Sequence, residues 1–525
     1  MKSGNSSSGK LPVGCAHCLT RRGFIATGCA AACSGALVGL GTQKVARAAS
    51  DEKLRLRILY SLHDEVQPGP DWPNVGFDFR PVMEKITNTL TRAFPKAEFR
   101  PAMAAGEEQA QKILADDEDQ DIDGYIVYQM NCWNRVVQTI AASGKPTLYV
   151  DFPYAGSGGF LVYTAQFLAD DTANLGFIAS SKLDDVVAAV KCFAPIKKNN
   201  NPNGFAAALA RVREENTKPA GDLSCIPDPM KPLSAEDTLA GMKASRILAV
   251  RDQEEKPDEE YLGIPLEWVT FAEVNEAWEK ADKDESKAVA DKWERAAWLV
   301  EDVSRETLEN SAAMYLGMKE VLEHHDANAI TINCLGGFYG GHIHAYPCLG
   351  FHELCNEGLI GACECDIRST STMIVANIMT GGRPGYISDP VMDMAKRQII
   401  YAHCVASNRV FGPDGASNNF EILTHSEDRQ GASVRSILPL GYMTTSLEFS
   451  PEHKEILMHQ GKAVDNDRND RACRTKLCAE PVGDFEKLYT QWHRYGWHRV
   501  TTYGDLKEPV YALADAMGYT VLEEA

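Results

Sequence analysis

Acidic and histidine side chains that could hold a metal ion are concentrated between residues 336 and 403. Glu364 lies within the apolar segment 362–367, Asp389 closes another apolar run, and His403 follows apolar and aromatic residues. Burying a carboxylate in such a setting is costly unless it is paired or bound to a cation. Carboxylate and imidazole ligands together suit Mn²⁺ or a similar borderline-hard divalent cation.

A further candidate ligand, His498, lies far downstream in the segment 496–505. Glu364 and Asp366 stand two residues apart, so a strand through both would point the two carboxylates to the same face. Considered singly, each of these residues also has a purely structural interpretation, as a hydrogen-bonded buried acid or a core histidine. Their combination is what indicates a metal site.

A glycine-rich segment at 336–344 carries His342 and His344 and follows a predicted strand at 329–334. Loops beyond the carboxyl ends of parallel strands are where α/β folds bind ligands. We therefore expect either a flexible loop whose histidines bind a polyol substrate or a simple turn. The segment matches neither the P-loop pattern nor a dinucleotide fingerprint, so nucleotide binding is not expected.

The elements that would position these residues follow an alternating strand and helix pattern. Predicted strands lie at 54–62, 124–130, 146–152, 246–250 and 329–334, and predicted helices at 81–94, 134–142 and 304–323. Such alternation predicts parallel sheets covered by helices. After about residue 380 the segments become shorter, with frequent Gly, Asp and Asn, which predicts a mainly β part.

These patterns predict an α/β fold in which two Rossmann-like α/β domains precede a β-rich C-terminal domain. The N-terminal α/β domain is expected at 50–195, the second at 196–380 and the β-rich domain at 381–525. The Asn- and Pro-rich passage at 197–232 marks the first boundary. The second domain would carry part of the active site.

The segment 347–390 resembles the L-fucose isomerase/L-arabinose isomerase superfamily. The resemblance rests on the E-x-D strand, the Ser/Thr-rich helix at 370–379, the following Thr-Gly-Gly-Arg-Pro sequence and Asp389, and on the G-x-H-R-V…Y-G-D pattern at 496–505. It implies two α/β domains with a β-rich C-terminal domain, assembly into trimers or hexamers, and a divalent metal, commonly Mn²⁺.

The resemblance also implies roles for individual residues. Glu364 and Asp389 match the family's metal-binding carboxylates and would act as base and acid while an aldose and a ketose interconvert through an ene-diolate. His498 matches the histidine supplied by the C-terminal domain. His403 falls where the arabinose isomerase branch has another histidine ligand, and Arg499 is a candidate substrate-binding residue.

Two other classes of function stay open at this point. An exported hydrolase or lyase of a carbohydrate could use the same cation. A sugar-binding protein could place two α/β lobes around a cleft without catalysis, and its acids would then serve as hydrogen-bond acceptors.

The first 50 residues are expected to be an export signal rather than part of the fold. Arg21 and Arg22 precede the mildly apolar stretch 24–40, and Ala46-Arg47-Ala48 fits a cleavage site. This pattern predicts a twin-arginine signal at 1–48 and a periplasmic or extracellular protein. The stretch is short and glycine-containing for a membrane span.

The rest of the chain is strongly acidic. Residues 51–525 carry 47 basic and 73 acidic side chains, a net charge of −26. Such a surface repels nucleic acid and anionic membranes, so neither is an expected partner once the signal is removed. The expected partners are a small-molecule sugar and, from the resemblance, further copies of the chain.

Replacing Arg21 and Arg22 with lysines tests the export prediction. The variant should accumulate in the cytoplasm, because the twin-arginine route depends on that pair. Cell fractionation followed by immunoblotting provides the measurement. Unchanged delivery outside the cytoplasm would show that the segment is not a twin-arginine signal.

Overall fold

The computed structural model describes residues 53–252 and 259–525. The predicted export signal at 1–48 lies outside these residues. Among the described residues, no helix combines the length and apolar character needed to cross a membrane.

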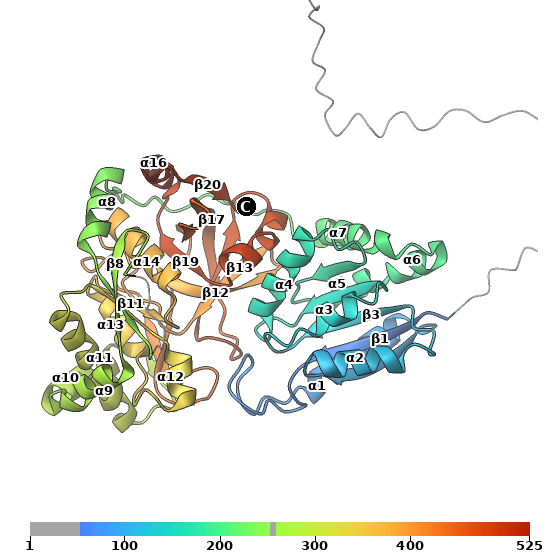
Figure 1. Ribbon diagram of the computed structural model, residues 1–525, viewed down its shortest axis with the longest axis horizontal. Coiled ribbons are helices and arrows are strands. Elements are labelled where there is room, and N and C mark those ends of the chain that lie inside the picture. The colour runs from blue at the N-terminus through green and yellow to red at the C-terminus, as the bar shows by residue number, and fades with distance from the viewer. Residues whose placement is uncertain (1–52, 253–258) are drawn as a thin grey trace, which may run out of the picture. The chain divides into compact units, whose positions relative to one another are not determined.

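The first part of the fold is a five-stranded parallel sheet in the order β2-β1-β3-β4-β5 (Figure 1). Its strands are β1 (Arg55–Ser61), β2 (Glu98–Ala104), β3 (Gly124–Gln129), β4 (Thr147–Asp151) and β5 (Leu175–Ile178). The central strands β3 and β4 are buried along their whole length, as expected for parallel strands with helices on both faces.

Helices cover this sheet. They are α1 (Arg80–Ala93), α2 (Glu107–Asp116), α3 (Val136–Ala141), α4 (Ser157–Ala169), α5 (Leu183–Val190), α6 (Phe193–Asn199) and α7 (Phe205–Asn216), with a short 3₁₀ turn η2 (Pro202–Gly204) before α7. Helix α1 contacts α5, and α2 contacts α3. The predicted strands and helices of this region are therefore confirmed to within a few residues.

A second sheet has the order β11-β10-β6-β8-β7. Strands β6 (Ile247–Val250), β8 (Ile264–Val269), β10 (Ala329–Ile332) and β11 (Ile360–Cys363) are parallel, and β7 (Glu260–Tyr261) pairs antiparallel at the edge. The accompanying helices are α8 (Ala235–Ala244), α9 (Phe271–Lys280), α10 (Lys283–Ala296), α11 (Arg305–His324), α12 (Cys334–Gly340), α13 (Cys348–Asn356) and α14 (Ile367–Met379).

The C-terminal part is built on a closed, six-stranded antiparallel barrel. Its strands follow the order β16-β19-β12-β13-β18-β17, and β17 pairs again with β16. They are β12 (Tyr386–Asp393), β13 (Gln398–His403), β16 (Met443–Ser450), β17 (Glu455–Asn466), β18 (Thr475–Pro481) and β19 (Arg499–Tyr503). Closure leaves no unpaired edge among these six strands.

Smaller elements complete the structure. Strand β20 (Thr520–Glu523) lies parallel to β17, and a separate three-stranded sheet combines β9 (Leu299–Val300), β14 (Phe420–Leu423) and β15 (Ser433–Ser436). The remaining helical elements are η3 (Phe485–Tyr489), α15 (Trp492–Tyr495) and α16 (Lys507–Met517). The structure thus confirms a mixed α/β fold with a parallel sheet and a β-rich C-terminal part, while the boundaries near residues 195 and 380 remain predictions.

Two local predictions are wrong. The glycine-rich segment is not a loop at its start, because residues 334–340 form helix α12. Glu364 is not inside a strand: β11 ends at Cys363, and Glu364 and Cys365 both adopt positive φ angles, 65° and 51°. Few residues other than glycine adopt such angles, which make a tight turn between β11 and α14.

A buried ion pair ties the C-terminus to the barrel. The guanidinium of Arg499 bonds both carboxylate oxygens of Glu524, at 3.1 and 2.6 Å, and His459 contacts the same carboxylate at 2.9 Å. Burial alone would raise the pKa of Glu524, but Arg499 and His459 lower it to about 2. The pair is therefore ionised over the ordinary pH range.

Glu524→Gln should lower the free energy of unfolding by about 3–5 kcal/mol, because it leaves the Arg499 charge buried without a partner. The pKa of Glu524 is depressed on folding, so its contribution is present above about pH 4.3 and is lost as the pH falls towards 2. Urea denaturation between pH 7 and pH 3 would measure both effects. Glu523→Gln, which removes the charge of an exposed carboxylate that pairs with Lys507 and accepts a hydrogen bond from Tyr511, should cost at most about 1 kcal/mol.

Candidate functional site

A cavity of about 280 Å³ opens where residues from the first sheet, the second sheet and the barrel meet. Four acids and three tryptophans are among the residues that line it. The complete lining is Pro70, Asp71, Trp72, Cys132, Trp133, Gly158, Leu335, Tyr339, Glu364, Asp389, Glu427 and Trp497. The cavity therefore contains the two carboxylates that the sequence singled out.

Glu364 reaches this cavity because of the turn that follows β11. The strand ends at Cys363, and the left-handed turn at Glu364 and Cys365 leads directly into α14. Glu364 thus stands beyond the carboxyl end of a parallel strand, the usual position of ligand-binding residues in α/β sheets.

Strand pairing in the barrel brings the other three residues together. Asp389 lies in β12, and His403 is the last residue of the neighbouring strand β13. On the other side, β12 pairs with β19, with Ser388 opposite Arg499. His498 directly precedes β19, so the antiparallel register brings it beside Asp389 although the two are far apart in sequence.

The four side chains converge on one point. One potential ligand atom from each of Glu364, Asp389, His403 and His498 lies within 4.8 Å of the others. The Nε2 atom of His498 is 3.2 Å from Asp389 and 3.5 Å from Glu364. The Nε2 atom of His403 is 3.7 Å from Glu364 and 3.9 Å from Asp389.

Both imidazole Nε2 atoms are buried and form no hydrogen bond within the described structure. Unpartnered buried polar atoms are rare in folded proteins and call for an explanation. Two carboxylates and two imidazole nitrogens aimed at the same point form a donor set that fits a divalent cation of the Mn²⁺ type. Glu364, Asp389, His403 and His498 are therefore the residues that could hold one.

Asp366 orients one of these imidazoles. Its carboxylate lies 2.8 Å from Nδ1 of His498 and also caps α14 by accepting hydrogen bonds from Ser369. Burial alone would raise the pKa of Asp366, but His498 and Ser369 lower it to about 2. The carboxylate thus holds a proton on Nδ1 and directs Nε2 into the site, as is common for histidine ligands.

The charges at the centre disturb one another strongly. Burial and the neighbouring Asp389 raise the pKa of Glu364 well above its usual range, although His498 opposes the shift. Burial lowers the pKa of His498, but Glu364, Asp389 and Asp366 together raise it well above the ordinary value. Strongly perturbed acids and bases in a cavity are typical of functional sites.

Aromatic and acidic residues that the sequence did not single out complete the cavity. The rings of Trp133 and Trp497 lie 4.9 Å apart, and the two residues remain 44% and 39% exposed. Tyr339 donates a hydrogen bond of 2.7 Å to Glu427, whose pKa burial raises to about 7. Trp497 had a sequence signal in its position next to His498, and Tyr339 lies in the glycine-rich segment, within helix α12. Trp133 and Glu427 come from separate loops and had none.

The predicted substrate-binding residues lie elsewhere. His342 stacks on Phe271, and His344 lies 3.8 Å from Glu279; neither is among the residues lining the cavity. The guanidinium of Arg499 is fully buried in its ion pair with Glu524. The prediction for Arg499 is corrected accordingly, because a paired core guanidinium cannot also reach a substrate.

A second group of potential metal ligands, Glu273, His324 and His325, behaves differently. Both ring nitrogens of His325 already contact carboxylates, Nδ1 at 2.8 Å from Glu267 and Nε2 at 2.7 Å from Glu273. This histidine has no free nitrogen, so the group is explained as an ion-pair cluster at the end of α11.

Comparisons with known proteins point to sugar isomerases. The chain is 23% identical over 253 residues to the sulfoquinovose isomerases of Priestia megaterium and Priestia aryabhattai, covering 47% of this chain and 55% of theirs. It is 24% identical over 161 residues to that of Alkalicoccus urumqiensis, covering 30% of this chain and 36% of the relative. The chain thus spans about half the length of the curated relatives it matches. No family model matches it.

Addition of Mn²⁺ should raise the melting temperature of the protein, because a cation that binds only the folded state stabilises it. His498→Ala should lose most of this increase. Asp366→Asn should keep the ligands but weaken Mn²⁺ binding about 10–100-fold, since the amide no longer fixes the imidazole. Thermal denaturation at several Mn²⁺ concentrations gives the apparent affinities.

The matched control is His325→Ala, which removes a histidine from the other acidic cluster. This variant should be less stable than the wild type yet show the same increase with Mn²⁺. An equal increase in the His498→Ala variant would place the cation elsewhere.

Proposed function

We propose that the chain is a metal-dependent sugar isomerase that interconverts an aldose and a ketose. The observation that carries the proposal is the convergence of Glu364, Asp389, His403 and His498 at one cavity, where two buried imidazole nitrogens form no hydrogen bond to any described residue. The similarity to sulfoquinovose isomerases supports the same class of reaction.

The chemistry of isomerisation explains why such residues are needed. Moving a carbonyl from C1 to C2 of a sugar removes a proton from C2 and returns one to C1, through an ene-diolate. A divalent cation, when bound, would stabilise the negative charge that develops on the two sugar oxygens.

Glu364 and Asp389 would supply the base and the acid. Both carboxylates line the cavity, and burial raises the pKa of Glu364 well above its usual range, as is common for carboxyl groups that transfer protons in enzymes. His498, held by Asp366, would keep the carboxylates in place and remain a ligand rather than transfer protons.

The cavity also favours one kind of sugar. Trp133 and Trp497 offer exposed apolar faces against which a sugar ring can pack. Asp71, Glu364, Asp389 and Glu427 are acceptors for hydroxyl groups, and neither Lys nor Arg is among the twelve lining residues. We therefore propose a neutral sugar as substrate in preference to an anionic one.

Mn²⁺, assembly into a homo-oligomer and export by the twin-arginine route complete the proposal. Mn²⁺ suits the mixed oxygen and nitrogen donor set. Oligomerisation rests on the family resemblance, and export rests on Arg21, Arg22 and the apolar stretch that follows them.

Glu364→Gln should abolish isomerisation while leaving the fold intact, because an amide cannot accept the proton. A loss of about 10²–10⁴-fold in kcat is expected for removing a general base. The assay would supply Mn²⁺ and a panel of neutral aldoses together with sulfoquinovose, and would follow ketose formation. Circular dichroism would confirm that the variant is folded.

Glu357→Gln is the matched control, since Glu357 pairs with Lys319 at a partly exposed position outside the cavity. It should retain full activity. If the Mn²⁺-loaded wild type converts no sugar, the isomerase proposal is wrong. Binding without conversion would then favour a sugar-binding protein, and cleavage of a glycoside would favour a hydrolase.

A further inference from the structure

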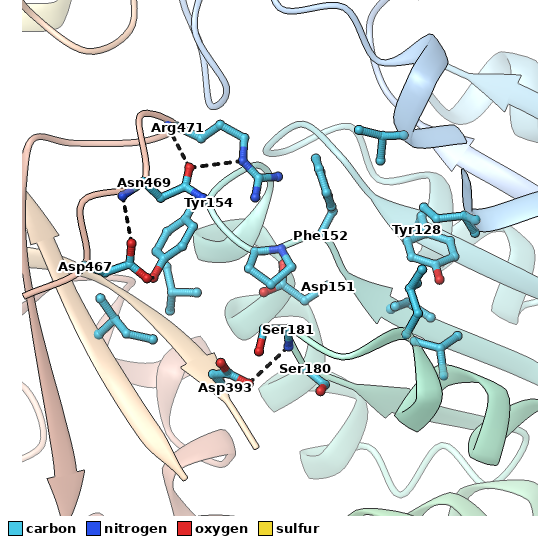
Figure 2. A pocket seen from close by; sticks show the side chains of 18 of the residues that line it. Tyr128, Asp151, Phe152, Tyr154, Ser180, Ser181, Asp393, Asp467, Asn469 and Arg471 are labelled. Carbon is cyan, nitrogen blue, oxygen red and sulfur yellow. Dashed lines mark hydrogen bonds between the residues drawn. The ribbon is translucent and has the colours of Figure 1, made fainter. Parts of the chain in front are cut away.

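A second and larger cavity, of about 460 Å³, shares no lining residue with the first. It lies where the loops after β4 and β5 face the barrel strands β12 and β13 (Figure 2). Its volume is in the range of small-molecule sites. The carboxyl ends of parallel strands are also where α/β sheets bind ligands.

The walls of this cavity are largely apolar. Ile86 of α1 and Val186 of α5 are 2% exposed, and Val391 and Ile400 of the barrel are 0% and 1% exposed. Phe152 adds an aromatic ring from the loop after β4. Such walls favour a ligand with an apolar body.

Arg471 brings a positive charge to the cavity. Asp151 and Asp467 attract this charge from a distance, but no carboxylate of the described residues forms a hydrogen bond or close ion pair with it. Its Cζ atom lies 4.2 Å from the centre of the Phe152 ring, and its Nε donates to Asn469 at 3.3 Å. Nη1 is buried and has no hydrogen-bond partner in the described structure. A guanidinium stays charged in proteins, so burying an unpaired donor nitrogen has an energetic cost.

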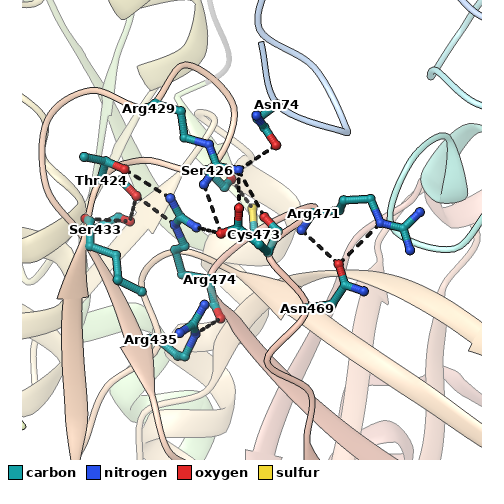
Figure 3. A network of polar contacts seen from close by, with 12 residues as sticks. Asn74, Thr424, Ser426, Arg429, Ser433, Arg435, Asn469, Arg471, Cys473 and Arg474 are labelled. Carbon is teal, nitrogen blue, oxygen red and sulfur yellow. Dashed lines mark hydrogen bonds and ion pairs between the residues drawn. The ribbon is translucent and has the colours of Figure 1, made fainter. Parts of the chain in front are cut away.

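Neighbouring arginines show that this is unusual for the region (Figure 3). Arg429 pairs with Asp470 at 2.7 Å, Arg474 pairs with the same residue at 2.7 Å, and Arg435 pairs with Glu421 at 2.9 Å. Each of the three has a carboxylate partner. Arg471 turns away from them, and its dashed contacts in Figure 3 lead to Asn469.

The acids that line the cavity are already engaged. Asp151 accepts hydrogen bonds from Ser157 at 3.0 and 3.1 Å, and Asp467 accepts one from Tyr154 at 2.8 Å. Asp393 accepts one from the backbone of Ser181 at 3.1 Å. The Lys396 ammonium lies between Asp393 and Asp467, at 3.9 and 3.8 Å. These contacts occupy the nearby carboxylates, so that among the described residues the buried Nη1 atom of Arg471 is left without an acceptor.

We propose that this cavity binds a small organic carboxylate, whose carboxylate group pairs with Arg471 and whose apolar body lies against Phe152, Val186 and Val391. The two terminal nitrogens of a guanidinium match the two oxygens of a carboxylate. A monoanion is favoured over a dianion such as phosphate, because Asp151, Asp393 and Asp467 also line the cavity and their repulsion grows with the charge of the ligand. The site is independent of the proposed isomerase activity.

Benzoate and benzamide test the proposal, because they share a shape and differ in charge. Isothermal titration of the full chain should show benzoate binding about tenfold or more tightly than benzamide, the factor expected for hydrogen bonds to a charged group. Arg471→Gln should remove that preference. Arg429→Gln, which removes the same charge from a paired arginine close by, should keep it.

A second variant tests the apolar part of the cavity. Leu183→Trp adds bulk at a partly exposed lining position and should weaken both compounds alike. If Arg471→Gln does not fold, two measurements still test whether the cavity binds a carboxylate: the benzoate preference of the wild type and the weaker binding expected for Leu183→Trp. The proposal is overturned if the wild type does not bind benzoate at millimolar concentrations, if it binds both compounds equally, or if Arg471→Gln keeps the preference.

Discussion

Two carboxylates and two imidazoles held away from water form the arrangement on which the rest of the structure depends. The ligand atoms of Glu364, Asp389, His403 and His498 approach within 4.8 Å. Burial and repulsion from Asp389 raise the pKa of Glu364, and the Nε2 atom of each imidazole forms no hydrogen bond within the described structure. The surrounding fold has to keep these groups together against that repulsion, and a cation would relieve it.

Two features of the backbone hold the two carboxylates and the two imidazoles close together. Pairing of β12 with both β13 and β19 fixes Asp389, His403 and His498 by main-chain hydrogen bonds. The turn after β11 and the capping of α14 by Asp366 fix Glu364 and His498 from the other side. Helix α14 packs on the second sheet and on the barrel, so the two features are held in a common frame.

Much of the fold and part of the site could be predicted from the sequence. Strands, helices and the two carboxylates Glu364 and Asp389 are marked by patterns in the residues next to them. Alternating apolar segments located the parallel strands β1, β3, β4, β6 and β10 but missed β2, β5 and β8, and acids at the ends of apolar runs identified Glu364 and Asp389. The family resemblance added His498 and His403.

The remaining features depend on tertiary contacts. The sequence predicted a strand at 362–367 instead of the observed turn. It therefore did not show that Asp366 contacts His498, which is 132 residues away in sequence. Trp133, Tyr339 and Glu427 meet at the cavity only because two loops and helix α12, which are far apart in sequence, come together there. Arg499 looked functional because of its neighbours, yet its own partner, Glu524, lies at the far end of the chain.

The scattered origin of the four proposed ligands also affects when in folding a cation could bind. They come from a turn after β11, from two strands of the barrel and from the residue before β19, so no short stretch of chain contains the set. An incompletely folded chain therefore cannot capture the ion. A protein sent folded through the twin-arginine route, as the sequence predicts, would acquire its metal from the pool of the compartment in which it folds, and metal choice would precede secretion.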